Sequence, residues 1–160
     1  MSASETSHCE QYSIFKAEYK STEPELERIF EVANEPAETV QPLLSRVGYV
    51  FTKLPVEIRD DLLSDTNFRI SIDNCEPGKG RTVLMPELNS AGSSRCVVLK
   101  PRLASCNVLF AFYIIAHELA HAYLRNGGWG EITDREKAAD ALAASWGFTR
   151  PNRSLFPRFF

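Results

Sequence analysis

Residues 105–125 read SCNVLFAFYIIAHELAHAYLR, and no other stretch says as much about how this 160-residue chain folds. Wound at 3.6 residues per turn, the stretch carries apolar side chains on every side, as Phe112, Ile114 and Ile115 illustrate. A helix with no wide polar face is buried all round, so we predict a central core helix. The Asn-Gly-Gly sequence at residues 126–128 is typical of a helix C-terminus.

Two of the chain's three histidines lie inside this helix, at His117 and His121. Residues four apart share one face of an α-helix, about 6 Å apart along its axis, so both imidazoles can bind one metal ion. Glu118 is turned ~100° from His117, which lets it reach a water beside the ion without being a ligand. Zinc lowers the pKa of its water to about 7, and a glutamate can accept the proton. The spacing predicts one zinc ion per chain, with Glu118 as general base.

A metal-free helix is the alternative interpretation of the same residues. Short H-E-x-x-H matches occur by chance on ordinary helices, where the polar side chains face solvent. In a helix that is apolar all round, two imidazoles and a carboxylate without partners are costly to bury. The context of the motif therefore favours the metal site.

A catalytic zinc site needs a third protein ligand, and the next predicted helix, residues 134–146, offers carboxylates at Asp134, Glu136 and Asp140. Glu136 and Asp140 are four apart and face the same way. Thr133 to Glu136 also fits a capping box, in which the glutamate side chain folds back to the start of its own helix. In that case Asp140 or Asp134 takes the metal.

The two motifs together resemble a known family. H-E-L-A-H at residues 117–121, followed by E-K-A-A-D at residues 136–140, resembles the gluzincin pattern of zinc metallopeptidases. The resemblance covers residues 97–148, whose end is similar to minimal gluzincins such as the ImmA/IrrE-like and CAAX-peptidase-like groups. It implies that Glu136 is the third ligand beside the histidines. It also implies that Asp140 hydrogen-bonds to a ligand histidine without binding the metal itself.

The chain departs from that pattern in one respect. Many zincins stabilise the oxyanion with a tyrosine or histidine beyond the metal helices, and neither follows Phe148. Tyr113 lies one turn before His117 on the metal-binding face, but we expect it, like Tyr49 and Tyr123, to pack in the core. A zinc ion is itself a Lewis acid and is expected to carry most of the oxyanion charge.

Helix signals dominate the residues before Asn67. A capping residue and a proline begin one helix at Thr22-Glu23-Pro24, with apolar residues at helical spacing as far as Ala33. Two further helices are expected at residues 36–48 and 55–63, each beginning with a proline.

Strand signals follow. Residues 68–73 alternate apolar and polar side chains, residues 76–80 have turn chemistry, and residues 82–88 and 96–99 read as two further strands. We expect a three-stranded antiparallel meander, which gives an α+β fold of minimal zincin type.

The length of the chain suits one domain. We expect a flexible segment at residues 1–21, a single zincin-like domain at residues 22–150 and a tail at residues 151–160. His8 lies in the polar first segment and is expected to be solvated.

Composition narrows the class of protein. The net charge is −3, from 18 basic and 21 acidic residues, and no basic block suggests nucleic-acid binding. The most apolar run, residues 108–116, is shorter than the ~20 residues that cross a membrane. No secretory signal precedes it, and the four cysteines form no C-x-x-C pair, so we expect free thiols and a cytoplasmic protein.

The sequence therefore predicts a zinc-dependent metallopeptidase that hydrolyses peptide bonds in a peptide or protein substrate, with a regulatory protein partner as a further possibility. The alternative is a zinc-bound regulatory or binding module of the same fold that catalyses nothing.

Overall fold

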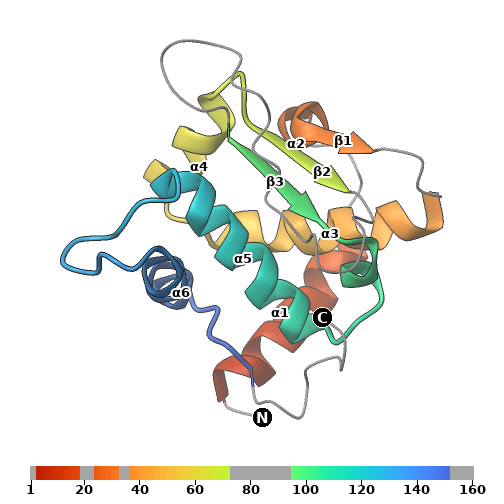
Figure 1. Cartoon of the computed structure of the whole chain (residues 1–160). Coiled ribbons are helices and arrows are strands. Elements are labelled where there is room, and N and C mark those ends of the chain that lie inside the picture. Colours follow the sequence, from red (N-terminus) through yellow and green to blue (C-terminus); the bar gives the residue numbers. More distant parts are fainter. Residues whose placement is uncertain (1–2, 19–23, 33–36, 73–94, 152–160) are drawn as a thin grey trace.

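The structure, a computed structural model, describes residues 3–18, 24–32, 37–72 and 95–151 (Figure 1). In chain order its elements are α1 (Ala3–Glu18), α2 (Pro24–Ile29), β1 (Phe30–Val32), α3 (Ala37–Lys53), α4 (Val56–Ser64), β2 (Arg69–Ile72), β3 (Cys96–Leu99), the 3-10 helix η1 (Pro101–Ala104), α5 (Val108–Leu124) and α6 (Arg135–Ser145). None of these helices is both long and apolar enough to cross a membrane.

The three strands form one parallel sheet in the order β1-β2-β3. Ile70 of β2 pairs with Phe30 on one side and with Val97 on the other. Parallel neighbours need a crossover connection of a dozen or more residues, and α3 and α4 lie in the connection between β1 and β2. The predicted antiparallel meander, and with it the α+β zincin layout, is therefore wrong: the described fold is mostly helical with a small parallel sheet.

The error lies in strand direction and has a physical cause. The strands predicted at residues 68–73, from alternating hydrophobicity, and at residues 96–99, from an apolar run after a turn, match β2 and β3, but neither signal contains the direction of the strand. The turn at residues 76–80 and the returning strand at residues 82–88 both lie outside the described residues. Among the described residues, β2 pairs directly with β3 in parallel.

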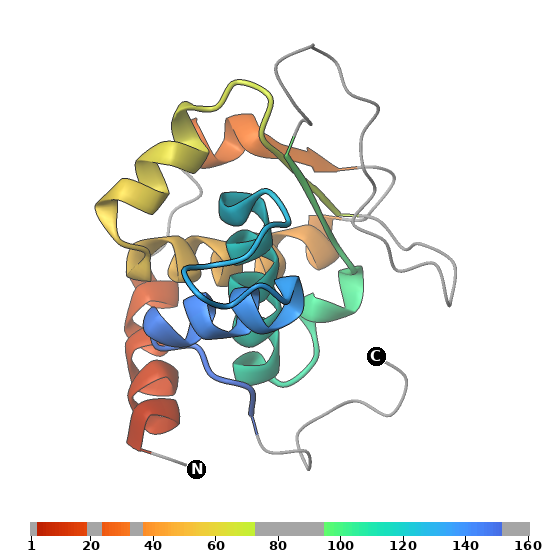
Figure 2. The same cartoon turned by 60° about the vertical axis from the view of Figure 1, so that its left-hand side comes forward.

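Helix α5 is the centre of the molecule, as predicted. It contacts α6 on one side and β3, α3, α4 and α1 on others, and it lies between α6 and the sheet (Figures 1 and 2). Phe112, Ile115 and Leu119 are almost fully buried along it. Asn107 begins the helix, since its Oδ1 accepts hydrogen bonds from the backbone N–H groups of the second and third helical residues.

Two helix boundaries differ from the prediction. Helix α2 ends at Ile29, and Phe30, which we placed in that helix, begins β1. Helix α3 continues through Gly48, where we expected it to end, as far as Lys53. Gly48 is buried in the middle of α3, so packing outweighs the weak helix propensity of glycine there.

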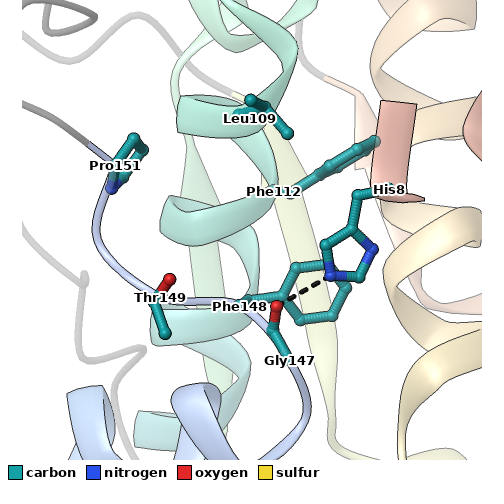
Figure 3. A pocket seen from close by; sticks show the side chains of 7 residues that line it. All are labelled: His8, Leu109, Phe112, Gly147, Phe148, Thr149 and Pro151. Atoms are coloured by element: carbon teal, nitrogen blue, oxygen red, sulfur yellow. Dashed lines mark hydrogen bonds between the residues drawn. The ribbon is translucent and has the colours of Figure 1, made fainter. Parts of the chain in front are cut away.

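The N-terminal segment that we expected to be loose forms helix α1, which packs against α3 and α5. We expected His8 to be solvated, but its side chain instead holds α1 against the rest of the fold. Its Nε2 donates a hydrogen bond to the carbonyl of Gly147 at 2.7 Å (Figure 3). Its Nδ1 lies 2.7 Å from the hydroxyl of Tyr49. The imidazole also stacks on Phe148 with ring centroids 4.6 Å apart. Residue 8 therefore joins the first helix to the end of the last.

Candidate metal centre

Three side chains converge where α5 faces the start of α6. His117 and His121 come from α5, and Glu136 comes from the first turn of α6. Nε2 of His117 lies 3.1 Å from Nε2 of His121. Oε2 of Glu136 lies 3.0 Å from the first nitrogen and 3.2 Å from the second. The fold thus brings together the three residues for which the sequence suggested a metal-binding role.

The size of this triangle suits a tetrahedral zinc ion. Zinc binds histidine nitrogen and carboxylate oxygen at about 2.0–2.2 Å, which places neighbouring ligand atoms of a tetrahedron roughly 3.3–3.5 Å apart. The three separations of 3.0, 3.1 and 3.2 Å are only slightly shorter. Two imidazoles and one carboxylate are also a donor set of catalytic zinc sites, in which a fourth position is left for water. The residues present therefore fit zinc.

Asp140 determines which nitrogen of His117 faces the cluster. Its Oδ1 lies 2.8 Å from Nδ1 of His117, and a carboxylate oxygen accepts, so Nδ1 carries the proton. Nε2 then turns a lone pair toward Oε2 of Glu136, only 3.0 Å away. Two acceptors at this distance repel each other unless a cation or a second proton lies between them. An aspartate on the outer nitrogen is the arrangement that orients metal-binding histidines.

His121 lacks an equivalent support. Its Nδ1 is buried and has no hydrogen-bond partner among the residues that the structure describes. When Nε2 binds a cation, the remaining proton must sit on this Nδ1, and an unpaired buried donor costs about 1–3 kcal/mol. The two histidines are therefore unequal, because Asp140 supports only His117.

The start of α6 decides between the two readings of Glu136. The N-cap of α6 is Asp134, whose Oδ1 accepts a hydrogen bond from the backbone N–H of Lys137 at 2.9 Å. The capping box that would begin at Thr133 is therefore not formed, and Glu136 reaches the histidines instead of its own helix start. Asp134, an alternative ligand in the sequence, is occupied as a cap.

Glu136 remains well suited to bind a cation. Burial tends to raise its pKa, but the hydrogen bond from His121 and the charges of both histidines outweigh this and hold the pKa below its usual value. Its side chain is 63% exposed, whereas those of His117 and His121 are 11% and 7% exposed. The cluster is therefore open to solvent on the side of α6.

Glu118 follows His117 on α5, and it is half-buried. At ~100° per residue it leaves the helix to one side of the face that carries the two histidines. From this place we expect Glu118 to reach a water molecule beside the cluster without being one of the three converging groups.

Tyr113 and Arg150 also lie beside this cluster. We predicted that Tyr113 packs in the core and made no prediction for Arg150; Tyr113 is buried, but its hydroxyl also makes polar contacts. The buried Tyr113 hydroxyl donates to Oδ1 of Asp140 at 2.6 Å and accepts from Nε of Arg150 at 3.2 Å. Burial, followed by the hydrogen bond to Asp140, raises the pKa of Tyr113 to about 12, so the hydroxyl keeps its proton. The spacing of four from His117 was the available signal for Tyr113; nothing marked Arg150.

The loop between the two helices is tightly built. Arg125 and Asn126 have φ angles of 50° and 59°, a left-handed turn that ends α5 at Leu124, one residue before the predicted end. Backbone hydrogen bonds of 2.9 Å run in both directions between Trp129 and Ile132. A Cβ on Gly128 would lie 2.4 Å from the carbonyl oxygen of Ile132, so only glycine fits there. The loop fixes the spacing between the histidine helix and the glutamate helix.

A small pocket lies away from this cluster, between α1, α5 and the segment after α6. His8, Phe112, Phe148 and Pro151 are among its lining residues (Figure 3). Its volume of about 10 Å³ holds roughly one water molecule, far less than a substrate site requires. The cluster of His117, His121 and Glu136 is the better candidate for chemistry.

Comparison of the chain with models of protein families, with curated proteins and with solved structures finds no match. The resemblance to gluzincins therefore rests on the sequence motifs alone.

Proposed function

We propose that this protein is a zinc metallopeptidase that hydrolyses peptide bonds. The observation that carries the proposal is the convergence of His117 Nε2, His121 Nε2 and Glu136 Oε2 within 3.2 Å of one another. These three side chains would hold one zinc ion per chain. A bound zinc ion would supply Lewis acidity, which lowers the pKa of a water molecule and polarises a carbonyl group.

Glu118 is the general base in this proposal. It takes a proton from the attacking water as the water oxygen bonds to the carbonyl carbon of the substrate. It then passes that proton to the amide nitrogen as the carbon–nitrogen bond breaks, so that the leaving amine departs neutral. Asp140 keeps the proton of His117 on Nδ1 and so keeps Nε2 available as a donor to the metal.

An extended peptide or protein is the substrate class that we favour. The glutamate side of the cluster is exposed, which suits a long chain rather than an enclosed small molecule. Strand β3 is an edge of the sheet among the described residues, and it contacts α5. A substrate backbone can add to such an edge by main-chain hydrogen bonds. We also propose that the protein is cytoplasmic.

Cleavage of a diverse peptide mixture, followed by mass spectrometry, tests the enzyme. Wild-type protein loaded with zinc is compared with Glu118→Gln, which keeps the shape of the side chain but cannot accept the proton. We expect the variant to retain zinc and to cleave at least 100-fold more slowly, because general acid–base catalysis contributes about 10²–10⁴-fold. Equal cleavage by both proteins would remove Glu118 from the mechanism.

A second function, a zinc-bound regulatory or binding module, is supported by one observation. The hydroxyl of Tyr113, one turn before His117 on α5, is engaged by Asp140 and Arg150 and so is not free to stabilise an oxyanion. If zinc-loaded wild type cleaves no peptide in the mixture while binding zinc with one ion per chain, the module replaces the enzyme.

A further inference from the structure

A single oxygen atom joins three residues at the metal cluster. Oδ1 of Asp140 accepts from the hydroxyl of Tyr113 at 2.6 Å and from Nδ1 of His117 at 2.8 Å. Tyr113 and His117 are four residues apart on α5, so they lie on the same face and hold the aspartate of α6 between them. A carboxylate oxygen has two lone pairs, and both are used here.

Asp140 needs this second contact to stay in place. Its side chain is 43% exposed, so solvent competes for its oxygens and the carboxylate can rotate toward water. Tyr113 is only 3% exposed, so its side chain has little room to move and its hydroxyl is held in place by burial. A rigid buried donor thus fixes a carboxylate that is itself half in water.

Arg150 strengthens the same hydrogen bond from the other side. Its Nε donates to the Tyr113 oxygen at 3.2 Å, and its guanidinium carbon lies 5.5 Å from the centre of the Tyr113 ring. A donor on the oxygen directs the hydroxyl proton toward Asp140 and polarises it, which makes successive hydrogen bonds reinforce each other.

We propose that Tyr113 is a positioning residue for the metal ligand His117: through Oδ1 of Asp140, its hydroxyl holds the His117 imidazole with Nε2 aimed at the metal. The proposal rests on the metal site of the proposed function and adds a residue that acts on zinc affinity without touching zinc. A tyrosine that merely joins α5 to α6 would contribute to the stability of the metal-free protein and leave the affinity for zinc unchanged.

The test compares zinc affinities, measured by competition with a chelator of known affinity, in Tyr113→Phe and in a matched control. Tyr49→Phe is that control, because Tyr49 is also buried and also loses a hydroxyl that is bonded to a histidine, His8, away from the cluster. We expect Tyr113→Phe to weaken zinc binding about 10-fold, the lower end for residues that support a metal ligand, and Tyr49→Phe to leave it unchanged. Equal affinities of Tyr113→Phe and wild type, with reduced stability only, would overturn the proposal.

A double-mutant cycle shows whether Tyr113 acts through Asp140. Asp140→Ala removes the shared oxygen, so adding Tyr113→Phe to it is expected to cause no further loss of zinc affinity. If the two losses instead multiply, Tyr113 acts by another route and the proposal is wrong. If wild-type protein binds no zinc, the metal site itself is refuted. If wild type binds zinc and Tyr113→Phe binds it equally well, only the role of Tyr113 is refuted.

Discussion

Nδ1 of His117 donates a hydrogen bond of 2.8 Å to Oδ1 of Asp140, and this bond links the central helix to the last one beside the cluster of His117, His121 and Glu136. It fixes the protonated nitrogen of His117 and leaves Nε2 to face His121 and Glu136. The sequence motifs alone give residue types; this contact gives the histidine an orientation that suits metal binding.

Asp140→Asn is expected to weaken zinc binding about 10–100-fold, because an amide supports the His117 N–H less well than a carboxylate. Chelator competition measures the change. Asp134→Ala is the matched control on the same helix: it removes the N-cap of α6, which costs about 1 kcal/mol of stability in denaturant unfolding. Loss of zinc from Asp134→Ala with retention by Asp140→Asn would reverse the roles that we assign to these two aspartates.

Gly128→Ala is expected to change the spacing between α5, which carries the two histidines, and α6, which carries Glu136. The added Cβ would meet the carbonyl oxygen of Ile132 at 2.4 Å, so the backbone of the loop must shift. Zinc affinity should fall together with stability. Gly130→Ala provides the comparison, since Gly130 has φ +58° but nothing near its Cβ, and should cost about 1 kcal/mol with little effect on zinc. Normal zinc affinity in Gly128→Ala would show that the loop does not set the spacing.

We expect the ionised side chain of Asp65 to make the stability of the fold depend on pH in acid. Its partner Arg95 is buried, and Nε of Arg95 donates to Oδ2 of Asp65 at 2.7 Å. Burial tends to raise the pKa of Asp65, but the Asn67 backbone N–H and Arg95 outweigh this and lower it. A lowered folded-state pKa gives stability that is complete above the unfolded pKa, near 4, and is lost as the pH falls through the folded pKa.

Asp65→Asn should therefore reduce the free energy of unfolding by roughly 1–3 kcal/mol at pH 7 and by much less at pH 2. Denaturant unfolding of the metal-free proteins at both pH values measures this difference. A deficit that is equal at the two pH values would show that the ionised form of Asp65 is not what stabilises the fold.

His8→Ala tests whether α1 is part of the folded unit. The change removes two hydrogen bonds of 2.7 Å and the stacking on Phe148, and should cost roughly 1–3 kcal/mol without altering zinc affinity. Ile14→Ala on the same helix, at a residue 63% exposed, should change stability by less than about 0.5 kcal/mol. Equal stability of the two variants would mean that α1 does not depend on His8.

Local spacing predicted the part of the site that lies on one helix. His117 and His121 are four apart, and helical geometry is sufficient to put them on one face. The position of Glu136 relative to the histidines depends on the path of the loop at residues 125–134, which local spacing does not predict. The resemblance to gluzincins was the reason to expect Glu136 beside them. The sequence left Glu136 open between metal binding and capping because both use the same side chain; the cap on Asp134 became visible only in three dimensions.

Contacts between residues far apart in the sequence could not be predicted either, because they depend on the three-dimensional path of the chain. Nothing in residues 69–72 and 96–99 encodes their relative direction, which depends on the path of the chain between them. His8 in a polar segment resembles a solvated residue until Gly147 and Tyr49 are brought to it from distant parts of the chain. Arg150 likewise gains its partner Tyr113 only through the fold.

Zinc content per chain is the most direct measurement, made by elemental mass spectrometry on protein purified without added metal, for wild type and Glu136→Ala side by side. We predict close to one zinc per wild-type chain and a large loss in the variant, because in the proposed site Glu136 provides one of the three ligand atoms. Full retention of zinc by Glu136→Ala would move the third ligand elsewhere. No zinc in wild type, even after zinc is added back, would contradict the metal site and the peptidase together.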